Sequence, residues 1–193
     1  MKIQKRMIRN LEYINYKFRH LVALIVIIIV WLGINLLIQK LDIIPRFLLS
    51  FFLMVFFVSF SAFLIRRLGI ALLLIIMSFI AIKSLPDLVG LGYIGLLSII
   101  IVGLIFEFSY LILYMKNHLV SLDIILAITL SFASIPLWTG LLLSPTLVSI
   151  KMYELLNLIL LDFFVALAAV LLAFLLWFHI RVSRLIVLFE NAP

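Results

Sequence analysis

The stretch YIGLLSIIIVGLIFEFSYLILYM, residues 93–115, decides the fold class of this chain. A helix needs about 20 consecutive apolar residues to cross a bilayer, and this stretch is longer. It carries a single charged residue, Glu107. The stretch therefore predicts a membrane-spanning helix with one acid inside it.

The rest of the chain has the same character. Of its 193 residues, 68% are hydrophobic and 12% are charged, and its mean hydropathy of +1.44 excludes an ordinary soluble domain. Six apolar runs are separated by short connections, at residues 21–39, 43–65, 68–82, 89–115, 119–143 and 155–178. We predict an all-α polytopic membrane protein, a compact bundle of six transmembrane helices over residues 21–180.

The two ends and the basic residues indicate topology. In residues 1–20, apolar positions recur at helical spacing among basic ones, which predicts an amphipathic interfacial helix held by anionic lipid or by a partner. Of the 15 lysines and arginines, most fall on the side of the N-terminus, so both termini are expected in the cytoplasm, with a short tail over 181–193. The net charge of +7 is then a topology signal in a multi-pass protein of the cell membrane, with no nucleic-acid partner.

Two acids lie deep within the predicted spans. Gly103 precedes Glu107 by one helical turn and would allow another helix to approach, so Glu107 is expected to face the bundle interior. Asp162 is followed by alanines at offsets of 4, 7 and 11 residues, which predicts a small-residue face packed against other helices. Buried intramembrane acids are candidate functional groups, but hydrogen bonding across helices is an equal alternative.

A second group of polar and aromatic residues lies near the outer ends of the spans. The segment ASIPLWTGLLLSP, residues 133–145, contains Pro136, Gly140 and Pro145 and predicts a broken helix. Two interpretations remain open: an interfacial aromatic belt, or a ligand pocket that opens to the outside. The pocket interpretation predicts six substrate-binding residues: Asp162, Glu107, Trp138, Tyr93, Asn157 and Asn35.

The chain lacks recognisable catalytic motifs. It contains no His-Glu-x-x-His metal pair and no Gly-x-Ser-x-Gly nucleophile turn, and its histidines lie at the ends of the spans. We therefore predict that the chain is not an enzyme and that it holds no cofactor or metal.

Two short motifs carry a family resemblance. Residues 65–69, Ile-Arg-Arg-Leu-Gly, are similar to an Ile-Arg-basic-x-Gly turn, and Gly103-x-x-x-Glu107 is similar to a Gly-x-Gly-x-Glu element further along. In these motifs and in span count the chain resembles the S components of energy-coupling factor (ECF) vitamin transporters, of the thiamine or hydroxymethylpyrimidine type. The resemblance implies a membrane subunit that binds a vitamin-like ligand such as thiamine from outside. It also implies an ECF transmembrane coupling subunit and ATPases as partners, beside the lipid bilayer.

The motifs also differ from that family in ways that favour an alternative. Ile105 stands at the second glycine, and Ala23 is followed four residues later by Ile27, where S components carry a second alanine for docking the coupling subunit. Rod-shape scaffold proteins of the MreD type have a similar span count. The alternative prediction is a structural subunit of a membrane complex, in which the acids lock helix packing.

Overall fold

The structure is a computed structural model, and it describes residues 18–38, 43–65, 69–81, 93–117, 120–143 and 152–182. These residues form α2 (Phe18–Ile38), α3 (Ile43–Ile65), α4 (Ile70–Ala81), α5 (Tyr93–Asn117), α6 (Val120–Ala133), α7 (Ile135–Leu143) and α9 (Met152–Val182). The described residues are helical almost throughout, which confirms the prediction of an all-α fold. The helix bounds follow the predicted apolar runs closely.

Within the described residues, four helical stretches are long and apolar enough to cross a membrane. They are His20–Ile38, Leu48–Ile65, Leu122–Leu143, which joins α6 and α7, and Met152–Ile180. In α5, the stretch whose side chains are described, Leu97–Ile112, is also apolar, within a helix of 25 residues. The described part of α4 has 12 residues, about 18 Å at 1.5 Å per residue, against a hydrocarbon thickness of about 30 Å. The six predicted spans thus correspond to six helical segments, and four of these meet the length and composition criterion within the described residues.

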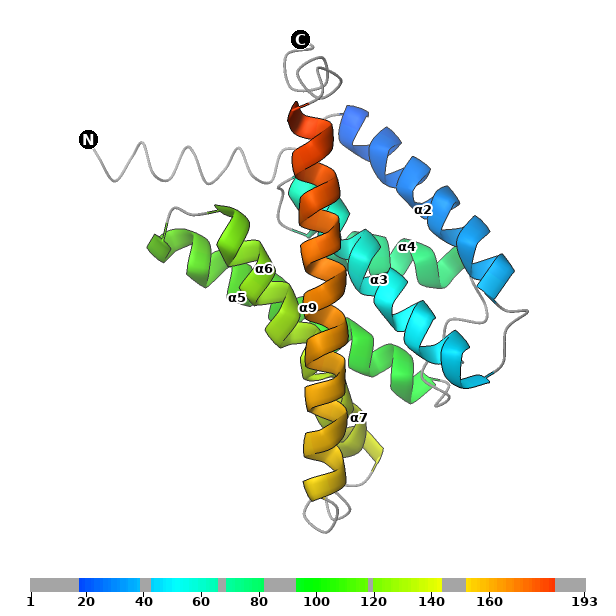
Figure 1. The fold of residues 1–193 in the computed structure, drawn as a ribbon. Coiled ribbons are helices and arrows are strands. Elements are labelled where there is room, and N and C mark those ends of the chain that lie inside the picture. Colours follow the sequence, from blue (N-terminus) through cyan, green and yellow to red (C-terminus); the bar gives the residue numbers. More distant parts are fainter. Residues whose placement is uncertain are drawn as a thin grey trace.

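The helices pack around α3 and α9, which lie side by side (Figure 1). Helix α3 also contacts α2, α4 and α6, and α9 also contacts α6 and α7. One aromatic cluster joins α3 to α9, with the ring of Phe63 5.6 Å from that of Phe174 and 5.7 Å from that of Trp177. Helix α5 completes the bundle against α4, α6 and α7.

Helix α2 is apolar on two faces. Its inner face contains Leu24, Ile28 and Trp31, which are at most 6% exposed and pack in the core. Its outer face carries large apolar side chains that are 41% to 67% exposed: Leu21, Val22, Ile25, Val26, Ile29, Val30, Leu36 and Leu37. A helix that is apolar all round belongs in a hydrophobic solvent, so this outer face is a lipid-facing surface.

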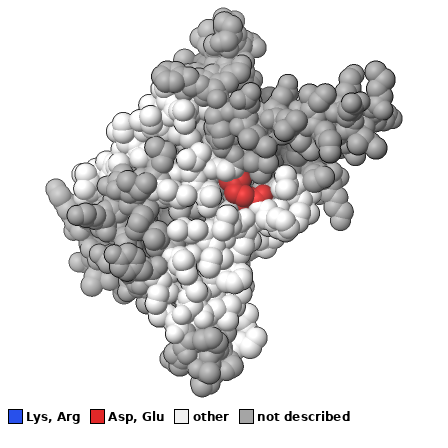
Figure 2. Space-filling model, turned by 180° about the vertical axis from the view of Figure 1, so that it is seen from behind, with Lys and Arg blue, Asp and Glu red and all other residues white. Residues whose placement is uncertain are grey.

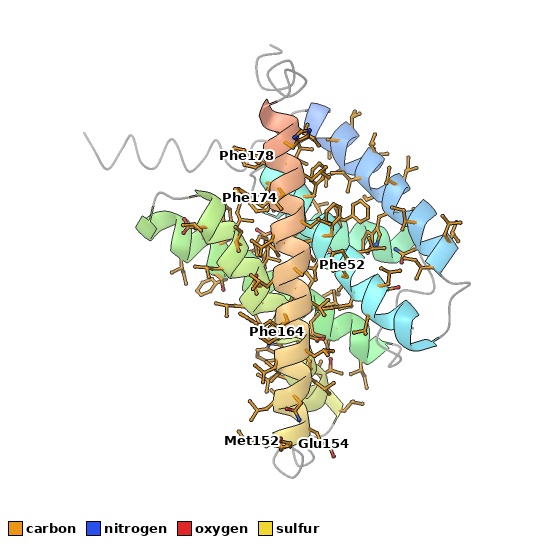
Figure 3. All side chains as sticks on the ribbon, in the orientation of Figure 1. Phe52, Met152, Glu154, Phe164, Phe174 and Phe178 are labelled. Atoms are coloured by element: carbon orange, nitrogen blue, oxygen red, sulfur yellow. The ribbon has the colours of Figure 1, made fainter. Side chains whose placement is uncertain are left out.

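The exterior of the bundle supports the same conclusion. Figure 2 shows one small acidic area on a face whose other described side chains are uncharged. On α9, Phe164 and Phe178 are more than half exposed and project from the helix (Figure 3). The predicted interfacial helix and tail lie mostly outside the described residues: only Phe18, Arg19 and His20 of the first segment are described, and they belong to α2.

Candidate functional site

Helix α9 places Asp162 in the interior of the bundle. The aspartate is 6% exposed, and the alanines at positions 166, 169 and 173 on the same face are fully buried. This confirms the predicted buried face of Asp162 and the alanines. Small methyl side chains let neighbouring helices approach closely, and α3 and α6 both contact α9. No hydrogen bond or ion pair joins the Asp162 carboxylate to another of the described residues. A buried acid without a partner is therefore the chemically conspicuous group of this helix.

The helix that runs beside the first part of α9 is α7, and a break separates it from α6. At the break, the Ser134 hydroxyl donates to the Ser131 carbonyl at 2.6 Å, and the Ser134 N–H donates to the same carbonyl at 3.2 Å. The Trp138 N–H then donates to the Ser134 carbonyl at 3.2 Å. Pro136 has no N–H to offer and takes the second position of α7, where none is needed. The predicted interruption of this span is thus confirmed.

Trp138 lies on α7 and packs partly buried against the core. Its indole Nε1 is buried and has no hydrogen-bond partner among the described residues. Helix α7 contacts both α5 and α9, and in Figure 1 it lies beside the lower half of α9, the half that carries Asp162. The indole N–H of Trp138 on α7 and the carboxylate of Asp162 on α9 are therefore an unpaired donor and an unpaired acceptor on two helices in contact, among the described residues.

A short hydrogen-bond chain ties α7 to α5. The Thr139 hydroxyl donates to Ser98 Oγ at 3.0 Å, and the Ser98 hydroxyl donates to the Ile94 carbonyl at 2.9 Å. Both side chains are buried, Ser98 completely. Thr139 lies within the segment predicted as a broken helix, whereas sequence reasoning missed Ser98. The available signal was a small hydroxyl residue within an apolar helix, a residue type that often bonds across helices in membranes.

Three of the predicted site residues do not join this group. Asn35 is buried on α2 and donates from Nδ2 to the Trp31 carbonyl of its own helix at 3.2 Å. Helix α2 contacts α3 and α4 but neither α7 nor α9, so the structure does not bring Asn35 next to Asp162. Asn157 is exposed on α9. Tyr93 is the first residue of α5, and its side chain lies outside the described part.

Glu107 occupies a different place, at the start of α4. Its Oε1 accepts a hydrogen bond of 3.1 Å from the backbone N–H of Ala71, and the N–H groups of Gly69 and Leu72 lie near the same carboxylate. The first N–H groups of a helix have no intrahelical partner, and the helix dipole favours a negative charge there. Ser98 marks the place where α5 meets α7, and Glu107 lies nine residues beyond it, about 13 Å along α5. Glu107 and Asp162 therefore belong to two separate sites.

A third acid is buried at one end of a helix. Asp123 is 1% exposed in the first turn of α6. Its Oδ2 has no hydrogen-bond partner among the described residues. An acid in the first turn of a helix suits the helix dipole, which is a local reason for its position that does not require solvent.

The fold and these sites define the class of the protein: a multi-pass helical membrane protein whose apolar helices contact lipid and enclose isolated acids. Within the described residues, no group of three or more metal-binding side chains is found. Comparison with protein-family models, with curated proteins and with solved structures finds no match to this chain. Its function must therefore be inferred from its own residues.

Proposed function

We propose that this chain is a membrane-embedded solute-binding subunit of an uptake system, and that its site lies where α7 meets α5 and α9. The single observation that carries the proposal is Asp162, an aspartate on α9 that is 6% exposed and has no partner among the described residues. Placing such a group at the centre of a membrane helix costs roughly 2.5 to 3.5 kcal/mol. A bound ligand with a positive charge or a strong donor would offset that cost.

The helices that meet here carry groups that suit a small organic cation with a flat ring. Trp138 offers an aromatic surface and an unused indole N–H on the adjacent helix. The bond between Thr139 and Ser98 holds α7 against α5, which keeps the broken helix in position. Thiamine has this chemistry, and the resemblance to ECF S components supports the same proposal. Tyr93 is proposed to add a second aromatic group, and Asn157 and Asn35 remain weaker candidates because of their positions.

In this proposal the chain works with other subunits. No phosphate-binding glycine loop occurs in the sequence, so the energy for uptake would come from separate ATPases through a membrane coupling subunit. We propose a cell-membrane location with both termini in the cytoplasm, which places Asp162 on the outer side of the midplane. A solute would then reach the site from outside.

A structural role is the second candidate, and Glu107 is the observation that favours it. This acid is engaged with the backbone of α4, as expected of a residue that fixes packing. In that case the chain would be a scaffold subunit of a membrane complex, as in the MreD-type alternative.

Native mass spectrometry of the gently purified protein tests the two proposals. The solute-binding proposal expects a stoichiometric small molecule that is lost in an Asp162→Asn variant. A Leu160→Ala variant, altered at a side chain that is 52% exposed on the same helix, is the matched control and should retain the molecule. A protein without a small molecule that co-purifies with another membrane subunit would instead support the scaffold role.

A further inference from the structure

Helix α4 begins without a capping side chain of its own. The residue before it is Gly69, whose carbonyl accepts the first helical bond, from the Leu73 N–H at 2.8 Å. Serine, threonine, aspartate or asparagine commonly holds this position and satisfies the N–H groups of the first turn. Here the acceptor comes from another helix, since Glu107 Oε1 on α5 accepts from the Ala71 N–H at 3.1 Å.

The backbone at this point can turn easily. Gly69 has a φ of 83°, in the left-handed region that residues with a Cβ rarely adopt. A few terminal residues of an element commonly absorb the dihedral change of a hinge. Gly69 therefore has the conformational freedom that a hinge at the start of α4 requires.

Helices α4 and α5 approach each other closely at Gly103. A Cβ added at Gly103 would lie 3.1 Å from Ile75 Cδ1 and 3.3 Å from Leu72 Cδ1, so the absence of a side chain lets α4 approach. Gly103 precedes Glu107 by one turn of α5. On the α4 side, Ala71 is completely buried. The polar bond and the close apolar contact thus fall on the same short stretch of the two helices.

We propose that Glu107 is a clip that holds the first turn of α4 closed against α5, and that Gly69 is the hinge about which this turn opens. The clip is the bond between Glu107 Oε1 and the Ala71 N–H. It uses one carboxylate oxygen, because Oε2 is buried with no partner among the described residues. Because the contact depends on one oxygen, losing the single bond to the Ala71 N–H releases it. A carboxylate with both oxygens bonded would have to lose several bonds before the turn could open.

The clip stands apart from the proposed solute site. It lies on α4 and α5, whereas Asp162 lies on α9, and α4 has no contact with α9 among the described residues. The inference therefore holds for a transport subunit and for a scaffold alike. Its test needs no ligand.

The test uses the complete absence of cysteine from the chain. An Ala71→Cys substitution introduces one thiol at a completely buried position of the first turn. The rate at which a water-soluble maleimide labels this thiol in the purified, detergent-solubilised protein reports how often the turn opens. Adding Glu107→Ala is expected to raise the rate at least tenfold. Adding Glu107→Gln, which keeps a side-chain acceptor oxygen, is expected to raise it less.

A reporter on another helix separates opening of this turn from general loosening. Ala169→Cys is the matched control, because Ala169 is also completely buried and lies on α9. Its labelling rate is expected to stay unchanged when Glu107 is replaced. An unchanged rate at position 71 would overturn the proposal, and so would an equal increase at both positions. A glutamine variant that labels as fast as the alanine variant would also overturn it, since the hydrogen bond would not be the contact that holds the turn.

Discussion

The region around Glu107 and the region around Asp162 answer the same physical problem in opposite ways. Both place a carboxylate within apolar helices. Glu107 accepts a backbone N–H at the start of α4, so the protein itself supplies its partner. Asp162 has burial and a face of alanines but no partner among the described residues. An acid in a membrane helix is therefore not in itself a sign of a ligand site; what matters is whether the fold already satisfies it.

The largest effect on stability is expected where the Glu107 region depends on close helix contact. A Gly103→Leu substitution would place a side chain against Ile75 and Leu72, and overpacking of this kind costs about 1 to 3 kcal/mol. The free energy of unfolding, measured by denaturant titration in detergent micelles, should fall by that amount.

The matched control for this prediction is Gly33 on α2. A Cβ added there meets nothing within 4 Å, and the residue lies on the outer face of its helix. Gly33→Leu should leave the free energy of unfolding unchanged or raise it slightly, because leucine favours helix more than glycine does. Equal losses in the free energy of unfolding for the two substitutions would show that the close approach of α4 at Gly103 does not stabilise the fold.

Several features of the fold were open to prediction from sequence. Continuous apolar runs marked the helices, Pro136 and its neighbours marked the break between α6 and α7, and the alanines that follow Asp162 marked its buried face. Each of these signals is local. It depends on residue types at fixed spacings along one helix.

Other features left no local signal. The partner of Glu107 is a backbone N–H, which every residue except proline possesses, so no residue type marks it. Nor does residue type alone predict that the ring of Tyr110, one turn beyond Glu107, stacks on Phe106, with centroids 5.9 Å apart. The packing of α3 along α9 joins spans far apart in sequence, and an apolar surface gives no code for which helix covers it.

A smaller effect is expected from removing each acid in turn. Glu107→Ala leaves the N–H groups of α4 without their acceptor and should lower the free energy of unfolding by about 1 to 2 kcal/mol, as for the loss of a helix cap. Asp162→Asn replaces a buried ionisable group that has no partner among the described residues by a neutral one, so the ligand-free protein should be unchanged or up to about 1 kcal/mol more stable. Opposite responses would support the contrast between the regions.

The same titration series contains the result that would break this contrast. If Asp162→Asn destabilised the ligand-free protein as much as Glu107→Ala does, Asp162 would be a packing residue as well. That result would support the scaffold role and count against solute binding.

The smallest effect concerns the bond that holds α7 beside Asp162. Thr139→Val removes the hydroxyl that donates to Ser98 Oγ while nearly preserving side-chain shape. Hydrogen bonds between membrane helices are worth about 0.6 kcal/mol on average, so the loss should be of that order. A double-mutant cycle of Thr139→Val with Ser98→Ala isolates the interaction, because Ser98 also donates within its own helix to the Ile94 carbonyl. A coupling energy of zero would mean that this bond does not position α7. In that case the break at Ser134 and the packing of Trp138 would have to hold the helix in place, and the Asp162 region would depend on shape alone.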